Sequence, residues 1–493
     1  MFKKVLIANR GEIALRIIRT CRDMGIATVA LFNGSDRGSL HVRLADQCRQ
    51  LTTPGGYTDG EAVLQIAREM GVDAIHPGYG FLAERSEFIE ACAAAGITFI
   101  GPPAKLVADL ACKVDVMAKA EKAGFKTPPH SAASYGEGEM DAIRAEAERI
   151  GYPVIIKSCM GGRGRGAHLV RTREHLADAV RHSQTESYTV YGDKRVYLEH
   201  ALLPAHQIGV QVIGDKQGNI VHLGEREGSI QVGNQKIVEE APSPFLSQAQ
   251  RETLRDMGVQ IARLFQFENA GTVEFVADEA GEFYFTEIKP RLQIEHPITE
   301  MISEVDLVQQ QLRVASGEPL GMTQSDITLR GWSILCRVSA EDPWNSFLPS
   351  PGRLTAYRLP AGPYVRVDTY AYRGCDIPVH YDPLLAMMVV WGANRDEAVR
   401  RAQRAMSEFS IAGVQTTVPL LQRILDDPDF VSGHYSTAFA HRELTGNLAN
   451  DSDRRDMAIA AAVAYLVRNR AGRPVTPARV RSGWHQDARR LPA

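Results

Sequence analysis

The first thirty residues pass from strand to helix to strand, and this order constrains the fold more than any other feature of the chain. Residues 3–8 form a short apolar run, and residues 11–25 then carry apolar side chains at helical spacing up to a glycine. A second apolar, β-branched run follows over residues 26–32. Strand, helix and strand in succession imply a right-handed parallel unit. Because the pattern repeats further along, the sequence predicts an open α/β domain over residues 1–113.

The remaining chain divides at glycine- and proline-rich stretches. A helical pattern ends in a strand at Lys157, a glycine-rich loop follows, and another strand closes this small unit. Strand-like runs dominate from residue 204 onward. We therefore expect, after the first domain, a helical linker over 114–130, a small mobile lid over 131–203, a larger α+β domain over 204–446, and a helix with an Arg-rich tail over 447–493.

Composition excludes several classes of function. The chain has 493 residues, 44% hydrophobic residues and a net charge of −3, which gives no general attraction to nucleic acid or to an anionic membrane. Its seven cysteines include no CxxC pair, so we expect reduced thiols and a cytoplasmic protein. The apolar run at the start stops at Asn9, too early for a signal peptide. The longest late apolar run, residues 457–467, is about half a membrane span.

Two carboxylates are predicted to face each other in a hairpin. Aromatic and β-branched runs flank the turn sequence DEAG, and a loop over residues 279–282 sets Glu274 across from Glu287. Opposed residues have Cβ atoms roughly 4.5–5.5 Å apart, so two carboxylates there need a proton or a cation between them. Mg²⁺ is commonly held by one or two carboxylates together with phosphates. A metal-dependent nucleotide site and an exposed hairpin with harmless charges remain the two interpretations.

Polar side chains then alternate with apolar ones at the end of this hairpin. Successive side chains of an extended chain point to opposite faces, so every second residue shares a face. The alternating residues are Glu287, Lys289, Arg291, Gln293 and Glu295. Such a row is either a binding surface or a solvated strand face, and we expect it to line an active site.

A lysine and a glycine-rich loop form a second candidate site. Backbone amides of such a loop can surround phosphates, although a plain flexible loop is the alternative. The residues are Lys157, Gly161, Gly162, Gly164 and Gly166, and their spacing matches neither a Walker loop nor a Rossmann turn. Taken singly, Lys113, Lys157 and Lys236 are each expected to be solvated.

Several stretches of the chain resemble the biotin carboxylases. They are residues 3–26, 76–84, 99–104, 151–158, 235–244, 291–302 and 340–354, in that order within residues 2–446. The resemblance implies a three-domain ATP-grasp fold that combines α/β and α+β parts. It also implies ATP, Mg²⁺ or Mn²⁺, and bicarbonate, which together carboxylate the ureido nitrogen of biotin on a separate carrier protein.

The resemblance also implies roles for individual residues. On the nucleotide side, phosphate contacts are implied for Lys113, Lys157 and the four glycines, adenine binding for Glu199 and the backbone near Leu202, and metal binding for Glu274 and Glu287. On the bicarbonate side, the residues that resemble the bicarbonate cradle are Lys236, Arg291, Gln293 and the Ile294 backbone. Glu295 resembles the general base, and Arg337 resembles the residue that stabilises the biotin enolate. The two cations, Lys236 and Arg291, can hold the planar bicarbonate anion by charge-assisted hydrogen bonds.

The chain departs from the family pattern mainly on the nucleotide side. The differing positions are Met160, Arg163, Gln207, Gly209, Asn234, Lys289 and Met387. Lys289 stands where the family has an asparagine metal ligand. Because an ammonium group donates hydrogen bonds and cannot coordinate a cation, Lys289 is expected to pair with Glu287 or Glu274 and to compete with one magnesium ion.

Three functions remain open from the sequence. The favoured one is the biotin carboxylase component of an acyl-CoA or pyruvate carboxylase. A weakened or inactive paralogue that acts as a structural or regulatory partner of an active enzyme is the alternative. A different ATP-grasp ligase is disfavoured by the family motifs at 235–244 and 291–302.

The resemblance implies partners as well. A biotin carboxyl carrier protein and carboxyltransferase subunits are expected, since no Met-Lys-Met motif and no carrier domain follow residue 446. A homodimer or a heterodimer with another biotin carboxylase is expected, because Arg16 and Arg19 match the family's interface. Neither nucleic acid nor a membrane is expected as a partner.

Overall fold

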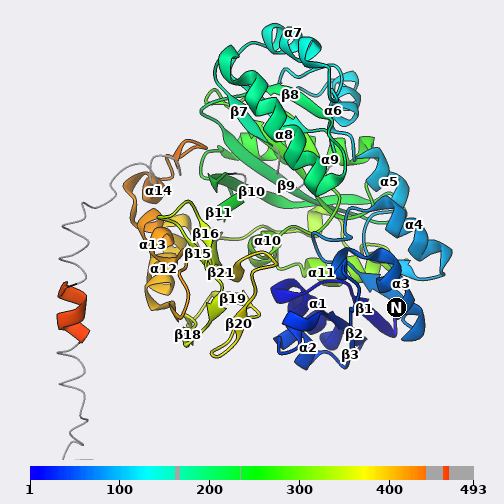
Figure 1. The fold of residues 1–493 in the computed structure, drawn as a ribbon, viewed down its shortest axis with the longest axis vertical. Coiled ribbons are helices and arrows are strands. Elements are labelled where there is room, and N and C mark those ends of the chain that lie inside the picture. Colours follow the sequence, from blue (N-terminus) through cyan, green and yellow to red (C-terminus); the bar gives the residue numbers. More distant parts are fainter. Residues whose placement is uncertain (161–166, 234, 440–458, 466–493) are drawn as a thin grey trace, which may run out of the picture. The chain divides into compact units, whose positions relative to one another are not determined.

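The computed structural model describes residues 1–160, 167–233, 235–439 and 459–465 (Figure 1). Met1–His441 form one compact unit and Arg442–Ala493 a second. In the second unit residues 459–465 are helical. Within the described residues, no helix combines the length and the apolar character that crossing a bilayer requires.

The chain begins with a five-stranded parallel sheet in the order β3-β2-β1-β4-β5, as the opening pattern predicts. Its central strand β1 is buried on both faces, which explains its unbroken apolar sequence. The strands are β1 (Lys4–Ile7), β2 (Ala27–Phe32), β3 (Gln47–Gln50), β4 (Ala74–His76) and β5 (Thr98–Phe99). The helices are α1 (Gly11–Asp23), α2 (Leu40–Leu44), α3 (Gly60–Glu69), α4 (Ser86–Ala94) and α5 (Ala104–Asp109).

A small antiparallel sheet follows, in the order β7-β6-β8. Its strands are β6 (Val154–Ser158), β7 (His168–Val170) and β8 (Val196–His200), and α7 (Met140–Ile150) and α8 (Leu176–Tyr191) supply apolar side chains to its core. The predicted linker helix is shorter than expected: α6 spans Lys113–Lys122. Gly124 at φ +92° and the prolines at 128 and 129 account for this end of the helix.

An antiparallel sheet of eight strands carries most of the polar side chains of interest, in the order β13-β12-β9-β10-β11-β14-β21-β19. These strands are β9 (His206–Gly214), β10 (Ile220–Val232), β11 (Gln235–Ala241), β12 (Asn269–Ala277), β13 (Phe283–Lys289), β14 (Trp332–Ser339), β19 (Val365–Thr369) and β21 (Leu384–Gly392). Short strands accompany them: β15 (Glu341–Asp342), β16 (Leu348–Pro349), β17 (Gly352–Arg353), β18 (Ala356–Arg358), β20 (Asp376–Ile377) and β22 (Ser410–Ala412).

Six helices accompany the large sheet: α9 (Gln248–Leu264), α10 (His296–Ser303), α11 (Leu307–Ala315), α12 (Arg395–Glu408), α13 (Val418–Asp426) and α14 (Pro428–Ser432). Helix α9 begins with a capping box in which Ser247 and Gln250 satisfy each other's backbone amides. A parallel sheet followed by antiparallel sheets gives the mixed α/β and α+β class that the sequence predicts.

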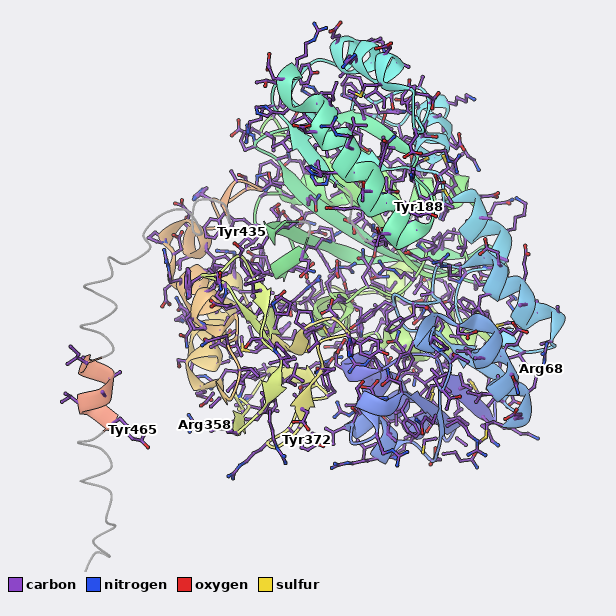
Figure 2. The ribbon with its side chains drawn as sticks, viewed as in Figure 1. Arg68, Tyr188, Arg358, Tyr372, Tyr435 and Tyr465 are labelled. Atoms are coloured by element: carbon purple, nitrogen blue, oxygen red, sulfur yellow. The ribbon has the colours of Figure 1, made fainter. Side chains whose placement is uncertain are left out.

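The first sheet is fixed against later parts of the chain by polar contacts. The Arg16 guanidinium on α1 lies 2.8 Å from both Glu300 and Asp306. At the far end of the same layer, the Tyr372 hydroxyl donates to the Gly38 carbonyl at 2.8 Å and accepts from Arg43 (Figure 2). These contacts hold the N-terminal layer where its side chains reach the polar region of the large sheet.

Candidate active site

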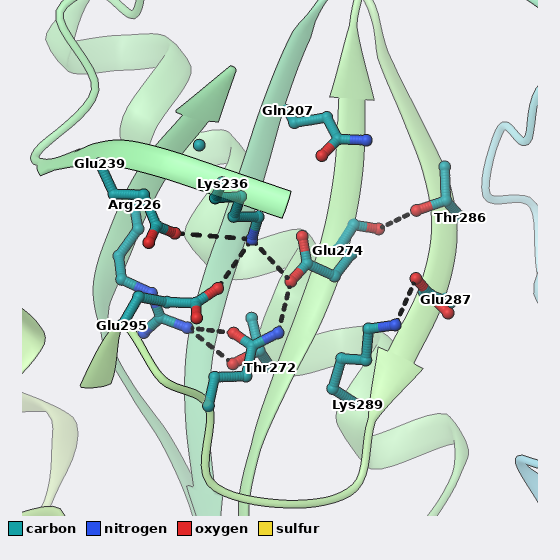
Figure 3. A network of polar contacts seen from close by, with 12 residues as sticks. Gln207, Arg226, Lys236, Glu239, Thr272, Glu274, Thr286, Glu287, Lys289 and Glu295 are labelled. Carbon is teal, nitrogen blue, oxygen red and sulfur yellow. Dashed lines mark hydrogen bonds and ion pairs between the residues drawn. The ribbon is translucent and has the colours of Figure 1, made fainter. Parts of the chain in front are cut away.

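The two carboxylates of the β12–β13 hairpin are opposed, as predicted: Glu274 pairs with Glu287 across the strands. The predicted loop, however, is one residue too short, because Ala277 pairs directly with Phe283. A β-bulge at Thr286 restores the expected pairing, and its hydroxyl donates to the Glu274 carbonyl at 3.1 Å (Figure 3).

Two ammonium groups share the carboxylate of Glu287. Lys289 Nζ lies 2.7 Å from Oε1 and Lys113 Nζ lies 3.2 Å from Oε2 (Figure 3 shows the first). Burial alone would raise the pKa of Glu287, but the two lysines outweigh it and hold that pKa well below its usual range. Burial lowers the pKa of Lys289, and Glu287 only partly offsets this. The expected pairing of Lys289 with Glu287 is confirmed.

A second cluster is formed by Lys236 on β11, Arg337 on β14 and Glu295 just before α10, and Figure 3 shows Lys236 and Glu295. Lys236 Nζ lies 2.8 Å from Glu295 and 3.5 Å from Glu274, and the Arg337 guanidinium lies 3.0 Å from Glu295 and 2.7 Å from Glu239. Although burial acts to raise it, the pKa of Glu295 stays well below its usual range because Lys236 and Arg337 stabilise the anion. Glu295 is therefore ionised at neutral pH.

Glu239 behaves differently from its neighbour Glu295. Burial, with the adjacent Glu295 charge, raises the pKa of Glu239 to about 7, although Arg337 and Lys236 lower it. One carboxylate of this pair thus titrates near neutral pH while the other does not. Glu239 was not predicted from the sequence, because nothing in the alternation of β11 marks it as different from the next residue, Glu240.

The buried side chain of Arg226 orients the side-chain amide of Gln293, which reaches Glu274. Arg226 donates to the Gln293 side-chain oxygen at 2.6 Å, and the Gln293 amide nitrogen donates to Glu274 at 2.7 Å. Arg226 also contacts Gln211, Thr272 and Thr299. Because its contacts fix which way Gln293 points, Arg226 is a positioning residue that sequence reasoning missed.

The predicted row of five residues does not form one strand face. Strand β13 ends at Lys289, because Pro290 has no N–H to continue the ladder, and the Arg291 amide donates to the Lys289 carbonyl at 2.9 Å. Gln293 and Glu295 still turn toward Lys236 and Glu274, whereas the Arg291 side chain pairs with Glu84 at 2.8 Å. The turn, and not strand alternation, brings these groups together.

The lysines expected to be solvated when taken singly are all paired. Lys157 at the end of β6 forms an ion pair with Glu199 on β8, and the Tyr197 hydroxyl donates to the other oxygen of Glu199 at 2.6 Å. Leu202 follows β8 and is half-buried, and Ile294 lies in the turn before α10. Gly161, Gly162, Arg163, Gly164, Gly166 and Asn234 lie outside the described residues.

Gly209 leaves room for the hairpin carboxylate. A Cβ at this position would meet the Thr272 side chain at 2.8 Å and the Glu274 oxygens at 3.4 Å. Gln207 accepts a hydrogen bond from Gln231, and Met387 is fully buried opposite Arg337 on β14. The departures at 207, 209 and 387 thus fit this chain's own packing.

Comparison with known families covers almost the whole compact unit. Residues 1–107 match "Biotin carboxylase, N-terminal domain", residues 113–323 match "Carbamoyl-phosphate synthase L chain, ATP binding domain", and residues 335–442 match "Biotin carboxylase C-terminal domain". Biotin carboxylase 1 of Bacillus subtilis is 42% identical over 443 residues, which are 89% of this chain and 98% of that protein. The chain belongs to the biotin carboxylase family.

Relatives and solved structures agree with this assignment. The biotin carboxylase of a Nostoc species is 43% identical over 441 residues, which are 89% of this chain and 98% of that protein. The biotin carboxylase domain dimer of Hydrogenobacter thermophilus 2-oxoglutarate carboxylase, in complex with MgADP, ADP and bicarbonate, superposes with a TM-score of 0.87 at 41% identity, covering 91% of this chain and 99% of that one. The biotin carboxylase ATP-grasp fold is therefore confirmed.

The candidate metal site differs from the one that the family resemblance implies. Glu274 and Glu287 supply two carboxylates that fit one divalent cation completed by phosphate oxygens. Lys289 presents an ammonium group beside them and does not fit as a third ligand. The described residues contain no group of three or more His, Cys, Asp or Glu side chains that could hold a metal.

Proposed function

We propose that the chain catalyses the ATP- and bicarbonate-dependent carboxylation of carrier-bound biotin, with Lys236, Glu295 and Arg337 as its catalytic residues. The observation that carries the proposal is the cluster itself: an ionised carboxylate held between two cations. This arrangement provides a base beside an anion-binding surface. Membership of the family supports the same reaction.

In this proposal Lys236, Arg291, Gln293 and the Ile294 backbone hold bicarbonate beside Glu295. Glu295 takes the bicarbonate proton, and the resulting oxygen attacks the γ-phosphate of ATP and releases ADP. The carboxyphosphate then decomposes to phosphate and CO2, which the ureido nitrogen of biotin captures. Arg337 stabilises the negative charge on the ureido oxygen while the released phosphate takes the proton of that nitrogen.

The nucleotide would lie between the small sheet and the hairpin. Lys113 and Lys157 would contact its phosphates, and Glu199 with the backbone near Leu202 would contact the adenine. Both lysines are paired with the chain's own carboxylates, so nucleotide binding must exchange these partners for phosphate oxygens. Glu274 and Glu287 would hold one Mg²⁺ or Mn²⁺ ion, which supplies positive charge to the phosphates when bound.

The partners in this proposal are a separate biotin carboxyl carrier protein and carboxyltransferase subunits. Relatives are named as components of pyruvate and propionyl-CoA carboxylases, and a solved relative is a dimer. We propose that this chain also works as a dimer within such an assembly. The final acceptor of the carboxyl group is an acyl-CoA or a 2-oxo acid.

The test is bicarbonate-dependent ATP hydrolysis with free biotin as acceptor. Glu295→Gln removes the base and keeps the shape, so we expect roughly a 100- to 10,000-fold lower rate. Glu282→Gln is the matched control, since Glu282 lies in the hairpin loop and pairs with the exposed Lys126. Equal rates for the wild type and Glu295→Gln would overturn the assignment of the base.

A weakened or inactive paralogue is the second candidate. The observation that favours it is the ammonium group of Lys289 on a proposed metal ligand. Calorimetry with MgATP separates the two proposals: the active enzyme binds the nucleotide, and a scaffold that has lost its site does not.

A further inference from the structure

Two cysteines that are 47 residues apart in the sequence bring their sulfur atoms together. Cys112 Sγ lies 3.1 Å from Cys159 Sγ. A disulfide bond is about 2.05 Å long, so the two sulfurs need to approach by only about 1 Å to form one. Cys112 is half-buried and Cys159 is fully buried.

The backbone holds the two cysteines in this position. Cys112 is the N-cap residue of α6, and Cys159 follows directly on β6. The Lys113 amide donates to the Cys159 carbonyl at 3.3 Å, and Cys112 forms an isolated antiparallel bridge with Met160. The paired backbones therefore keep the two cysteines side by side, so that their sulfur atoms can meet.

The other five cysteines lack this arrangement. Cys21, Cys92, Cys336 and Cys375 are buried and Cys48 is half-buried, and among the described residues only the 112–159 pair has a sulfur–sulfur contact. The oxidation of these five thiols can therefore be compared with that of the Cys112–Cys159 pair in the same protein.

We propose that Cys112 and Cys159 form a reversible disulfide that covalently joins α6 to β6. The site rests on geometry, and the local charges favour the chemistry. The hydrogen bond from Cys112, with Ser134 and Arg195, outweighs burial and Asp193 and lowers the pKa of Cys159 to about 7. For the partner thiol, the hydrogen bond with Cys159 and burial both raise the pKa of Cys112, and the side chain of Asp115 adds to this.

The reaction needs an oxidant, for which hydrogen peroxide is sufficient. The Cys159 thiolate attacks one peroxide oxygen and becomes a sulfenic acid, and the hydroxide that leaves takes up a proton to give water. The Cys112 sulfur then attacks the Cys159 sulfur and expels the second hydroxyl, which leaves as water with the Cys112 proton. Two thiols and one peroxide thus become one disulfide and two waters, and a dithiol reductant reverses the bond.

Each cysteine of the proposed disulfide is close in sequence to one of the two proposed phosphate lysines, so the following consequence rests on the proposed function. Lys113 directly follows Cys112, and Lys157 precedes Cys159 by two residues. In the arrangement that brings the sulfurs together, both lysines are paired with Glu287 and Glu199. A covalent link that fixes this arrangement opposes the exchange of carboxylates for phosphates. We expect the oxidised protein to bind MgADP more weakly, by roughly 5- to 150-fold.

The experiment oxidises the full chain with hydrogen peroxide and maps its peptides by mass spectrometry without reduction. We expect a cross-linked pair of peptides containing Cys112 and Cys159, its loss on adding a dithiol, and its absence in Cys112→Ser and in Cys159→Ser. Cys48→Ser is the matched control and should keep the cross-link. Oxidation that leaves both thiols free, or that links other cysteines, overturns the proposal.

Calorimetry with MgADP on the reduced and oxidised protein tests the consequence. Equal affinities in the presence of a mapped disulfide overturn the regulatory part and leave a structural cross-link. A reduced protein that does not bind MgADP contradicts the proposed function instead, and the peptide map alone then decides whether the disulfide forms.

Discussion

At the scale of single residues, the carboxylate of Glu287 is shared by two buried ammonium groups, and this sets how the site can treat a metal ion. A charge pair about 4 Å apart is worth roughly 4 kcal/mol at an effective dielectric constant of about 20, before the loss of hydration is counted. At the proposed metal site Lys289 would therefore compete with a cation for Glu287, whereas phosphate would draw Lys113 away.

Replacing Lys289 by asparagine should strengthen metal binding. The change removes the competing charge and supplies an oxygen ligand, so we expect the Mg²⁺ concentration for half-maximal ATPase activity to fall by roughly tenfold, about 1.4 kcal/mol. Mn²⁺ binding followed by electron paramagnetic resonance gives a readout that does not require turnover. Lys105→Asn, which removes an exposed lysine paired with Asp109, is the control. Identical metal titrations for Lys289→Asn and wild type would show that Lys289 does not compete.

The titration of Glu239 should appear in the pH dependence of the reaction. Its pKa is raised to about 7, so Glu239 is neutral below this pH and ionised above it. The added negative charge raises the proton affinity of Glu295 and makes it a stronger base. We expect the bicarbonate-dependent rate to rise through about pH 7, and Glu239→Gln to remove this rise. If the rate of Glu239→Gln rose over the same pH range and by the same factor as that of the wild type, another group would be responsible for the pH dependence.

At the scale of elements, the hairpin shows both what the sequence establishes and where it fails. The aromatic and β-branched runs around the turn sequence DEAG predicted β12, β13 and the pairing of Glu274 with Glu287. The predicted loop was one residue too short, and the bulge at Thr286 compensates for this. Alternation then failed beyond Lys289, since Pro290 ends the ladder. Contacts between distant segments, such as Arg291 with Glu84, depend on tertiary packing that periodicity does not carry.

Helix α1 contains a buried acid that should make stability depend on pH. Burial raises the pKa of Glu12 from 4.5 to about 7, although the Tyr79 hydroxyl donates to it and opposes this. The contribution of Glu12 to the free energy of unfolding is therefore fully present below pH 4.5 and is lost as the pH rises through 7. This contribution is about 3 kcal/mol at most. Glu12→Gln should unfold at the same temperature as wild type at pH 4.5 and at a higher one at pH 8. As a control, Glu61→Gln at an exposed position of α3 should leave the unfolding temperature unchanged at both values of pH. If Glu12→Gln shifted the unfolding temperature equally at pH 4.5 and pH 8, the pH dependence would not come from Glu12.

At the scale of the whole molecule, α1 also bears on the proposed dimer. Arg16 is buried against Glu300 and Asp306 of its own chain, whereas Arg19 is exposed. Arg19→Glu should therefore weaken the dimer without unfolding the monomer, and light scattering at micromolar concentration should show a lower mass. Arg68→Glu, on the exposed face of α3 (Figure 2), is the control. A monomeric wild type would contradict the proposed dimer directly.

The strand order of the large sheet has a consequence for synthesis of the chain. Strand β11, with Lys236 and Glu239, pairs with β14, which begins at Trp332, 91 residues after Ala241 ends β11. A ribosome adding roughly 5–20 residues per second leaves this strand edge unpaired for roughly 5–20 seconds. An unpaired strand edge is a template for pairing with another chain, so we expect the nascent chain to be prone to aggregation during that interval. Arg337 lies on β14 itself, so the proposed catalytic cluster is complete only when that edge is paired.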